Sequence, residues 1–219
     1  MNNYRRIGGW AALGEAATYL AAFVILLALL LPAGYQTGDV DAAESVAFLA
    51  DHQGLLYVWI LIIYLLAGVL LVVLVLALHD RLKAGSPPLA QIGAAFGLIW
   101  AGLILASGMI RVVTLGIIGD LFPTDPAQAE TVWLALNGAE EGLGGAIELP
   151  GAIWVLLVSW AALRAGWLPK ILNYLGLAIG VVGILTVVPA LGELVSLFGV
   201  ALIVWFIWLG IIMTFKKEK

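Results

Sequence analysis

The sequence has 219 residues, of which 63% are hydrophobic and only 11% are charged. A soluble domain of this size carries about 25% charged residues, so the composition excludes an ordinary soluble domain. It indicates a polytopic membrane protein that forms one transmembrane domain over residues 1–219, with the lipid bilayer as its first partner. The chain has no cysteine, which excludes disulfides, thiol catalysis and thiolate metal sites. We expect no nucleic-acid partner.

Six apolar stretches are long enough to cross about 30 Å of hydrocarbon at about 20 residues each. They predict an all-α bundle of six transmembrane helices at residues 7–31, 55–78, 90–112, 143–163, 171–190 and 194–215. The basic N-terminus before the first stretch is similar to a signal peptide. However, the apolar run exceeds the roughly 7–15 residues of a signal core, so we interpret it as a retained first span.

The positions of the basic residues predict the orientation of the spans. With six spans, every Lys and Arg except Arg111 falls on one side: Arg5, Arg6, Arg81, Lys83, Arg164, Lys170, Lys216, Lys217 and Lys219. Lys and Arg mark the cytoplasmic side of a membrane protein, so we predict that both termini are cytoplasmic. The opposite connections contain acidic residues and neither Lys nor Arg.

The first long outer connection contains a possible helix start. In DVDAAES, Asp41 stands three residues before Glu44, a spacing similar to a capping box. The apolar residues that follow fall on one face, which predicts a short extracytoplasmic helix at the membrane interface. An ordinary polar loop is the alternative.

A second helix start precedes the fourth span. Asp125 suits the N-cap, Pro126 the first helical position and Gln128 the third. An unbroken helix from there to Leu163 would be about 57 Å long at 1.5 Å per residue. Because that length exceeds the membrane, we predict a break or kink at Gly142–Gly145.

Charged residues inside the predicted spans are the candidates for function, because such groups are costly in hydrocarbon. They are Glu15, Arg111, Glu140, Glu141 and Glu148. We predict that Arg111 pairs with Glu141, Glu140 or Glu148. One arginine cannot neutralise four carboxylates, so we expect Glu15 and at least one glutamate of the fourth span to be protonated.

Helical spacing groups part of this set with an amide. Glu130, Asn137, Glu141 and Glu148 fall close to one line on a continuous helix. This predicts a polar stripe that faces the bundle interior or a cavity, with Glu148 as its deepest member. The predicted ligand- or proton-binding residues are therefore Glu148, Glu141, Glu140, Glu15, Arg111 and Asn137.

The rarity of other reactive groups limits the chemistry. His52 and His79 lie at opposite ends of the second span, about 40 Å apart, which excludes a bis-histidine haem. Every lysine is in a cytoplasmic connection or tail, which excludes a retinal Schiff base. Two carboxylates and an amide form only a sparse oxygen site for a metal. We expect no cofactor and no metal.

Tryptophans and glycines give two weaker patterns. Trp59 and Trp133 are among the tryptophans near span ends, where such residues form interfacial belts. Pairs of glycines four residues apart, at 138 and 142 and at 176 and 180, allow helices to approach closely. We interpret these pairs as packing within the chain, and a homodimer is the alternative.

The segment RAGWLPKILNYLGLAIGVVGIL, residues 164–185, carries a sequence pattern of its own. Its turn and glycines are Ala165, Gly166, Leu168, Pro169, Lys170, Leu175, Gly176 and Gly180. This pattern resembles the signature of the domain of unknown function family 4386. The resemblance implies six spans in a bacterial inner membrane, and it implies no activity.

Two functions of different classes remain. The first is an integral membrane protein that binds or transports a proton-coupled or cationic, lipophilic solute through a buried acidic site. The alternative is a structural or interaction protein whose buried charges only fix helix packing. An enzyme ranks third, because no nucleophile and base occur together at membrane depth.

Overall fold

The structure is a computed structural model that describes residues 2–36, 41–145 and 148–216. These residues form helices and no strand, so the predicted all-α class is confirmed. The helices are α1 (Asn2–Ile25), α2 (Ala42–Asp51), α3 (Gln53–Ile60), α4 (Ala67–Leu82), α5 (Pro87–Leu121), α6 (Pro126–Glu140), α7 (Leu149–Ala165), α8 (Lys170–Leu185) and α9 (Leu194–Phe215). Short π-helical segments η1 (Leu26–Leu30), η2 (Leu61–Leu66) and η3 (Glu141–Gly145) and the 3-10 turn η4 (Pro189–Leu191) join them.

Four continuous helical segments are long and apolar enough to cross a membrane. They are Asn3–Leu30, Gln53–Leu82, Pro87–Leu121 and Leu194–Phe215, and they contain most of the predicted spans 7–31, 55–78, 90–112 and 194–215. The other two predicted spans correspond to the shorter apolar helices α7 and α8.

The two shorter helices have different bounds from the predicted spans. The fourth span was placed at 143–163, but α7 begins at Leu149, after the π turn η3; residues 146 and 147 lie outside the described part of the chain. The fifth was extended to residue 190, but α8 ends at Leu185. Pro189 lacks an N–H and disfavours helical backbone at the residue before it, where Val188 is extended.

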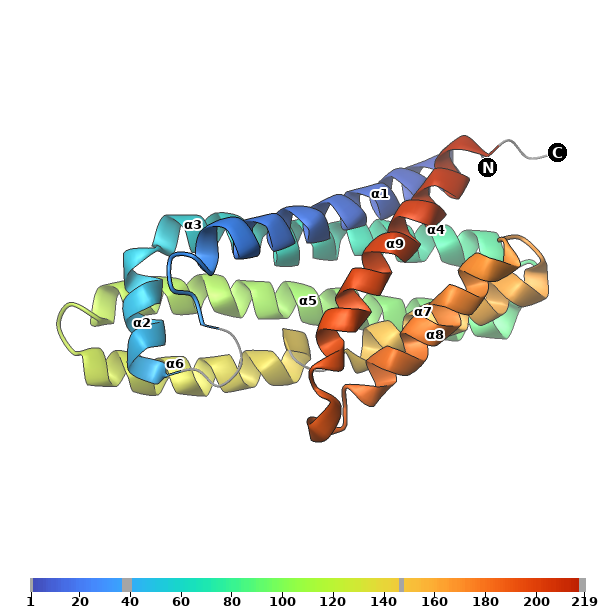
Figure 1. Cartoon of the computed structure of the whole chain (residues 1–219). Helices are drawn as coiled ribbons and strands as arrows, with labels where there is room; N and C mark the ends of the chain where they lie inside the picture. Colours follow the sequence, from blue (N-terminus) through green and yellow to red (C-terminus); the bar gives the residue numbers. More distant parts are fainter. Residues whose placement is uncertain (1, 37–40, 146–147, 217–219) are drawn as a thin grey trace.

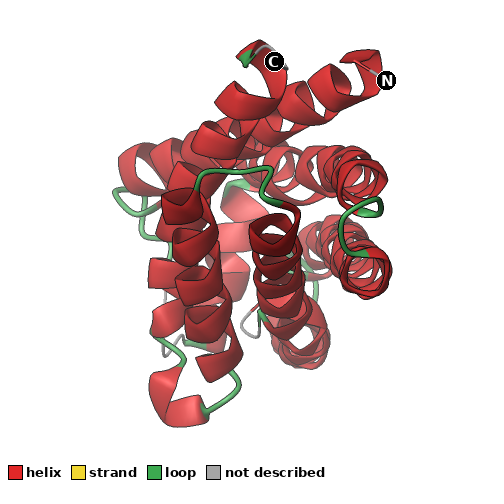
Figure 2. Cartoon of the chain, turned by 90° about the vertical axis from the view of Figure 1, so that its right-hand side faces the viewer, coloured by secondary structure: helices red, strands yellow, loops and turns green. Residues whose placement is uncertain are grey.

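The helices form an elongated bundle with α5 running along most of its length (Figure 1). α1 packs against α4 and α9, α4 against α5, and α5 against α7, which packs on α8. Figure 2 shows these helices side by side when the bundle is viewed from one end. α2 and α6 lie together at the opposite end, where α2 also contacts α5.

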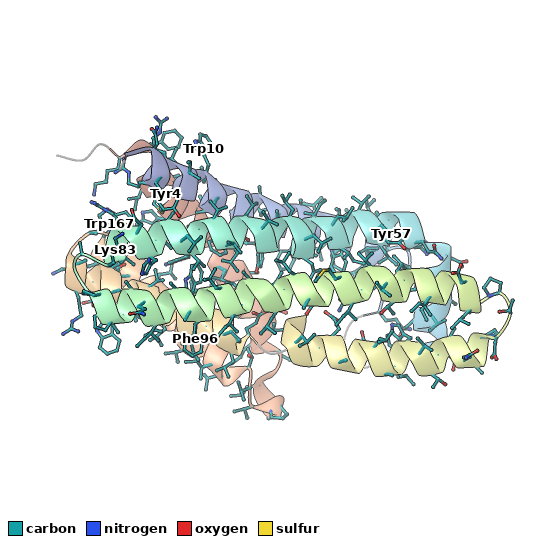
Figure 3. All side chains as sticks on the ribbon, turned by 180° about the vertical axis from the view of Figure 1, so that it is seen from behind. Tyr4, Trp10, Tyr57, Lys83, Phe96 and Trp167 are labelled. Carbon is teal, nitrogen blue, oxygen red and sulfur yellow. The ribbon has the colours of Figure 1, made fainter. Side chains whose placement is uncertain are left out.

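The basic turns and the first residues of α1 gather at one end of the bundle. In Figure 3, Tyr4, Lys83 and Trp167 lie at this end, while Tyr57 lies toward the other. The Arg81 guanidinium lies 5.2 Å from the centroid of the Trp167 ring, and Lys83 forms a 2.5 Å ion pair with Asp80. Lys217 and Lys219 of the predicted cytoplasmic set lie outside the described residues.

An aromatic cluster fills the half of the bundle built by α5, α7, α8 and α9. The rings of Trp100 and Trp154 are 5.7 Å apart, and those of Trp154 and Trp205 are 5.8 Å apart. Trp205 is fully buried, so it serves packing. On the outside, large apolar side chains are exposed along the helices, for example Ile171 at 70%. An apolar surface of this extent indicates membrane embedding.

Both predicted helix starts are confirmed. Asp41 accepts a hydrogen bond from the Glu44 N–H at 3.0 Å, and Asp125 accepts one from the Gln128 N–H at 3.0 Å. The first of these helices, α2, replaces the polar loop that was the alternative. It packs across α5 and α6 with Val46 fully buried, so its buried face meets protein, and its placement at the membrane interface stays a prediction.

The Asp125 cap gives a first testable expectation. Asp125→Ala removes the acceptor of the Gln128 N–H and should lower the free energy of unfolding by about 1 kcal/mol. For a chain of this size that corresponds to a melting temperature about 2–4 °C lower, measurable by circular dichroism in detergent. Asp125→Asn keeps an acceptor and should stay close to wild type. Equal losses in both variants would show that the cap contributes nothing.

Candidate functional site

The site is built where α6 ends. Glu140 and Glu141 are adjacent at this end, so their side chains point about 100° apart around the helix. Glu140 is buried, with 1% of its surface exposed, and Glu141 is exposed. The predicted stripe was to face the bundle interior or a cavity. Its member Glu141 does not enter the interior and instead lines the cavity described below, whereas Glu140, which is outside the stripe, enters the bundle.

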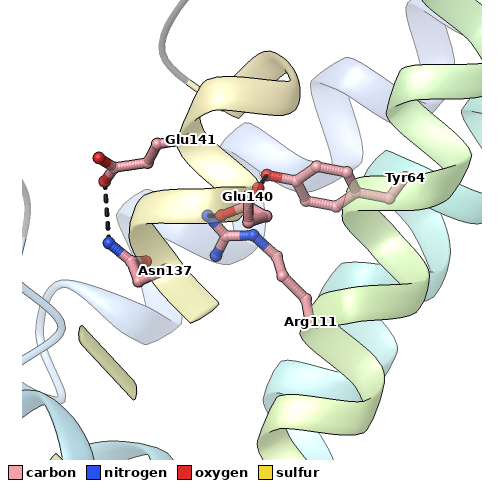
Figure 4. A network of polar contacts seen from close by, with 5 residues as sticks. All are labelled: Tyr64, Arg111, Asn137, Glu140 and Glu141. Atoms are coloured by element: carbon pink, nitrogen blue, oxygen red, sulfur yellow. Dashed lines mark hydrogen bonds and ion pairs between the residues drawn. The ribbon is translucent and has the colours of Figure 1, made fainter. Parts of the chain in front are cut away.

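Arg111 on α5 is the counter-charge of the buried glutamate. Its Nη2 atom lies 2.5 Å from Glu140 Oε2, which confirms the predicted ion pair. The Tyr64 hydroxyl donates to Glu140 Oε1 at 3.3 Å, and the Arg111 guanidinium lies 5.3 Å from the centroid of the Tyr64 ring. Figure 4 shows this group, with Glu141 pointing away from it. Three elements, η2, α5 and α6, are thus joined through one carboxylate.

The exposed glutamate has a partner on its own helix. Asn137 Nδ2 donates to Glu141 Oε1 at 3.0 Å, one turn away, so two members of the predicted stripe do share a face. The stripe does not continue to Glu148. The π turn η3 after α6 changes the helical phase, and Glu148 occupies the N-cap position of α7.

Glu148 lies in a separate polar cluster. Its Oε2 atom accepts a hydrogen bond from Trp100 Nε1 at 3.2 Å, and its backbone N–H donates to Thr186 Oγ1 at 3.2 Å. Thr186 in turn donates to the Gly183 carbonyl at 2.7 Å. Glu148 therefore joins the start of α7 to α5 and to the residue after α8.

A cavity of about 210 Å³ lies beside the ion pair. Polar groups from α5, α6 and η3 line it, including Arg111, Thr114, Asn137, Glu140 and Glu141. Its aromatic walls are Tyr35, Phe48, Trp59 and Trp133. Because Glu141 is also exposed, the cavity reaches the surface of the bundle. It lies among α2, α3, α5 and α6, at the end opposite the basic turns (Figures 1 and 3).

One π-helical segment contributes directly to this cavity, because Glu141 begins η3, and Ile60, which precedes η2, also lines it. π turns inside helices occur frequently at functional sites, which supports this cavity as the candidate site.

Of the predicted site residues, Arg111, Asn137, Glu140 and Glu141 meet at the cavity, whereas Glu15 and Glu148 do not line it. Glu15 lies inside the bundle on α1, with 2% of its surface exposed.

The aromatic members of the site were missed by sequence reasoning. Trp59 and Trp133 were expected to sit at the membrane surface as interfacial anchors, and both line the cavity. Tyr64 showed no signal that distinguished it from packing residues in an apolar span. Aromatic residues near span ends have the same pattern in either role, so only their contacts separate the two.

One comparison with known proteins identifies the family. A family model described as "Domain of unknown function (DUF4386)" matches residues 7–216. This range covers nearly the whole chain and includes the segment 164–185 that carries the resemblance. No curated protein and no solved structure gives a significant match.

Proposed function

The chain belongs to the DUF4386 family, and we propose that it is a binding protein of a bacterial inner membrane that takes a small lipophilic cation into the cavity beside Arg111 and Glu140. In this proposal all six apolar helices cross the membrane and both termini are cytoplasmic. The cavity then faces the extracytoplasmic side. The charge and the aromatic lining of the cavity are the observations that carry the proposal.

The arrangement of the helices supports six spans. α7 and α8 have 17 and 16 residues, so each is about 25 Å long at 1.5 Å per residue, close to the thickness of the hydrocarbon core. Lys83 in one basic turn and Trp167 in the other lie near the start of α1, where Tyr4 is labelled (Figure 3). Their common side is the one that Lys and Arg mark as cytoplasmic.

The charges of the cavity favour a cation. Arg111 and Glu140 neutralise each other, because their ion pair is direct. Glu141 remains, and its only described hydrogen-bond partner is the neutral amide of Asn137. Aromatic faces attract cations through their ring electrons, and Trp59 and Trp133 supply such faces in the same cavity. A cation with an apolar body matches both features.

The volume favours a small ligand. The cavity of about 210 Å³ is smaller than the roughly 300 Å³ at which cavities for drug-sized ligands begin. A monocation with a single ring or a few short alkyl groups is therefore the expected size.

Tryptophan fluorescence of the purified protein in detergent tests this proposal. Benzyltrimethylammonium should quench the emission saturably, because Trp59 and Trp133 line the cavity, and it should bind more tightly than benzyl alcohol or phenylacetate. Glu141→Gln should weaken cation binding about tenfold, a difference of about 1.4 kcal/mol. Glu130→Gln is the matched control, since it removes the same charge from α6, the helix that leads into Glu141, at a residue that does not line the cavity.

Equal affinity for the cation, the neutral probe and the anion would contradict the proposal, and so would unchanged cation binding in Glu141→Gln.

One observation favours a second candidate function. The direct pairing of Arg111 with Glu140 is also what a purely structural contact between α5 and α6 would show. In that case no probe quenches saturably, and loss of the pair affects only stability.

A further inference from the structure

Glu15 is a buried acid that the cavity does not use. It lies on α1 with 2% of its surface exposed, and its Oε1 atom has no hydrogen-bond partner among the described residues. The Thr18 hydroxyl bonds to the Glu15 backbone carbonyl at 2.8 Å, and that bond leaves the carboxyl group itself unchanged. Along the helix Glu15 is about 14 Å from Arg6, at 1.5 Å per residue, which places it well inside the first span.

The helices packed on α1 bring no cation to this carboxyl group. α1 contacts α4, α9, η1 and η2. η1 and α9 contain no titratable side chain, and η2 contributes Tyr64. α4 carries His79, Asp80 and Arg81 in its last turns. Gly14 lies against Leu70, so His79 is about 14 Å farther along α4.

A carboxylate without a cation is costly in the membrane interior. Burial favours the uncharged form of an acid, and a protonated carboxyl group also gains an O–H that can donate. A polar group is available to interact with it, since Tyr19 follows Glu15 by one helical turn and lies on the same face.

We propose that Glu15 is a proton-binding site within the membrane-spanning part of α1. The proposal stands on the burial of Glu15, on its Oε1 atom without a hydrogen-bond partner among the described residues, and on the lack of a nearby cation on the described helices packed against α1. It does not depend on cation binding in the cavity.

Infrared spectroscopy and carbodiimide labelling test the proton site without any cation. In the difference spectrum of wild type minus Glu15→Gln at neutral pH, Glu15 should appear as the carbonyl band of a protonated carboxylic acid. N,N′-dicyclohexylcarbodiimide should label Glu15. The carboxyl oxygen bonds to the carbodiimide carbon, the proton moves to nitrogen, and an acyl shift then gives a stable N-acylurea. A carboxylate band in place of the acid band overturns the proposal.

Glu15→Gln keeps the size and polarity of the side chain, so the variant should fold like wild type. Circular dichroism checks that its helix content is unchanged. If the cation does not bind in the cavity, the proposed function fails, and the infrared band still decides whether Glu15 holds a proton.

Discussion

Arg111→Met is expected to lower the free energy of unfolding by about 3 kcal/mol, because it leaves the buried carboxylate of Glu140 without its counter-charge. Glu140 has 1% of its surface exposed, and Arg111 contributes its nearest cation at 2.5 Å. The Arg111 side chain keeps 23% of its own surface exposed, so the loss should fall at the lower end of the range for buried pairs. Methionine retains most of the apolar volume of the arginine side chain, so the expected loss comes from the charge.

The double variant Arg111→Met with Glu140→Gln separates charge from packing. It removes both charges and should recover most of the loss, because neither partner is then left buried and ionised. Tyr64→Phe removes one neutral donor to Glu140 and should cost about 1 kcal/mol. Thermal unfolding in detergent, followed by tryptophan emission, measures all three. A double variant no more stable than Arg111→Met would show that the pair matters through shape and not charge.

Gly180→Ala is expected to lower the free energy of unfolding by about 2–3 kcal/mol through overpacking. A Cβ atom at this position would lie 2.6 Å from Leu156 Cβ and 2.9 Å from the Ala152 carbonyl oxygen. Both neighbours belong to α7, and one of them is backbone, so α8 would have to move away from α7. The same movement would disturb the contact between Thr186 and Glu148 that follows the end of α8.

Gly102→Ala is the matched control, because it adds the same methyl group in the interior of α5. No heavy atom of another described segment lies within 4 Å of its Cβ position, and alanine favours helix over glycine by about 0.5–1 kcal/mol. Gly102→Ala should therefore be neutral or slightly stabilising. The melting temperatures of the two variants should move apart, and equal shifts would contradict close packing at Gly180.

The close packing of Gly176 and Gly180 was foreseeable from their spacing, and the structure places both against α7 of the same chain, where Gly176 faces Ser159. Similar spacing at Gly138 and Gly142 has no such result, since no described heavy atom lies within 4 Å of either Cβ position. The two pairs look alike in the sequence. Two glycines four residues apart allow another helix to pack closely against them. The path of the neighbouring helix decides whether such close packing occurs.

Local chemistry accounts for the features that sequence reasoning found. The six apolar helices, the caps at Asp41 and Asp125, and the break after α6 all depend on residues within one or two turns of each other. The pairing of Arg111 with a glutamate could also be predicted from the sequence, because a lone cation at that depth needs a counter-charge. Such constraints act along the chain, so the order of residues reveals them.

The site depended on contacts between distant segments. Glu140 and Glu141 are neighbours in the chain, and the rotation of α6 against α5 decides which of them meets Arg111 and which lies at the rim of the cavity. The break after α6 moved Glu148 into a different cluster with Trp100. The cavity walls come from four helices and the segment after η1. Composition and periodicity determine that these helices form and are apolar, but their relative rotation is a balance of packing across the whole bundle, and only the tertiary structure settles it.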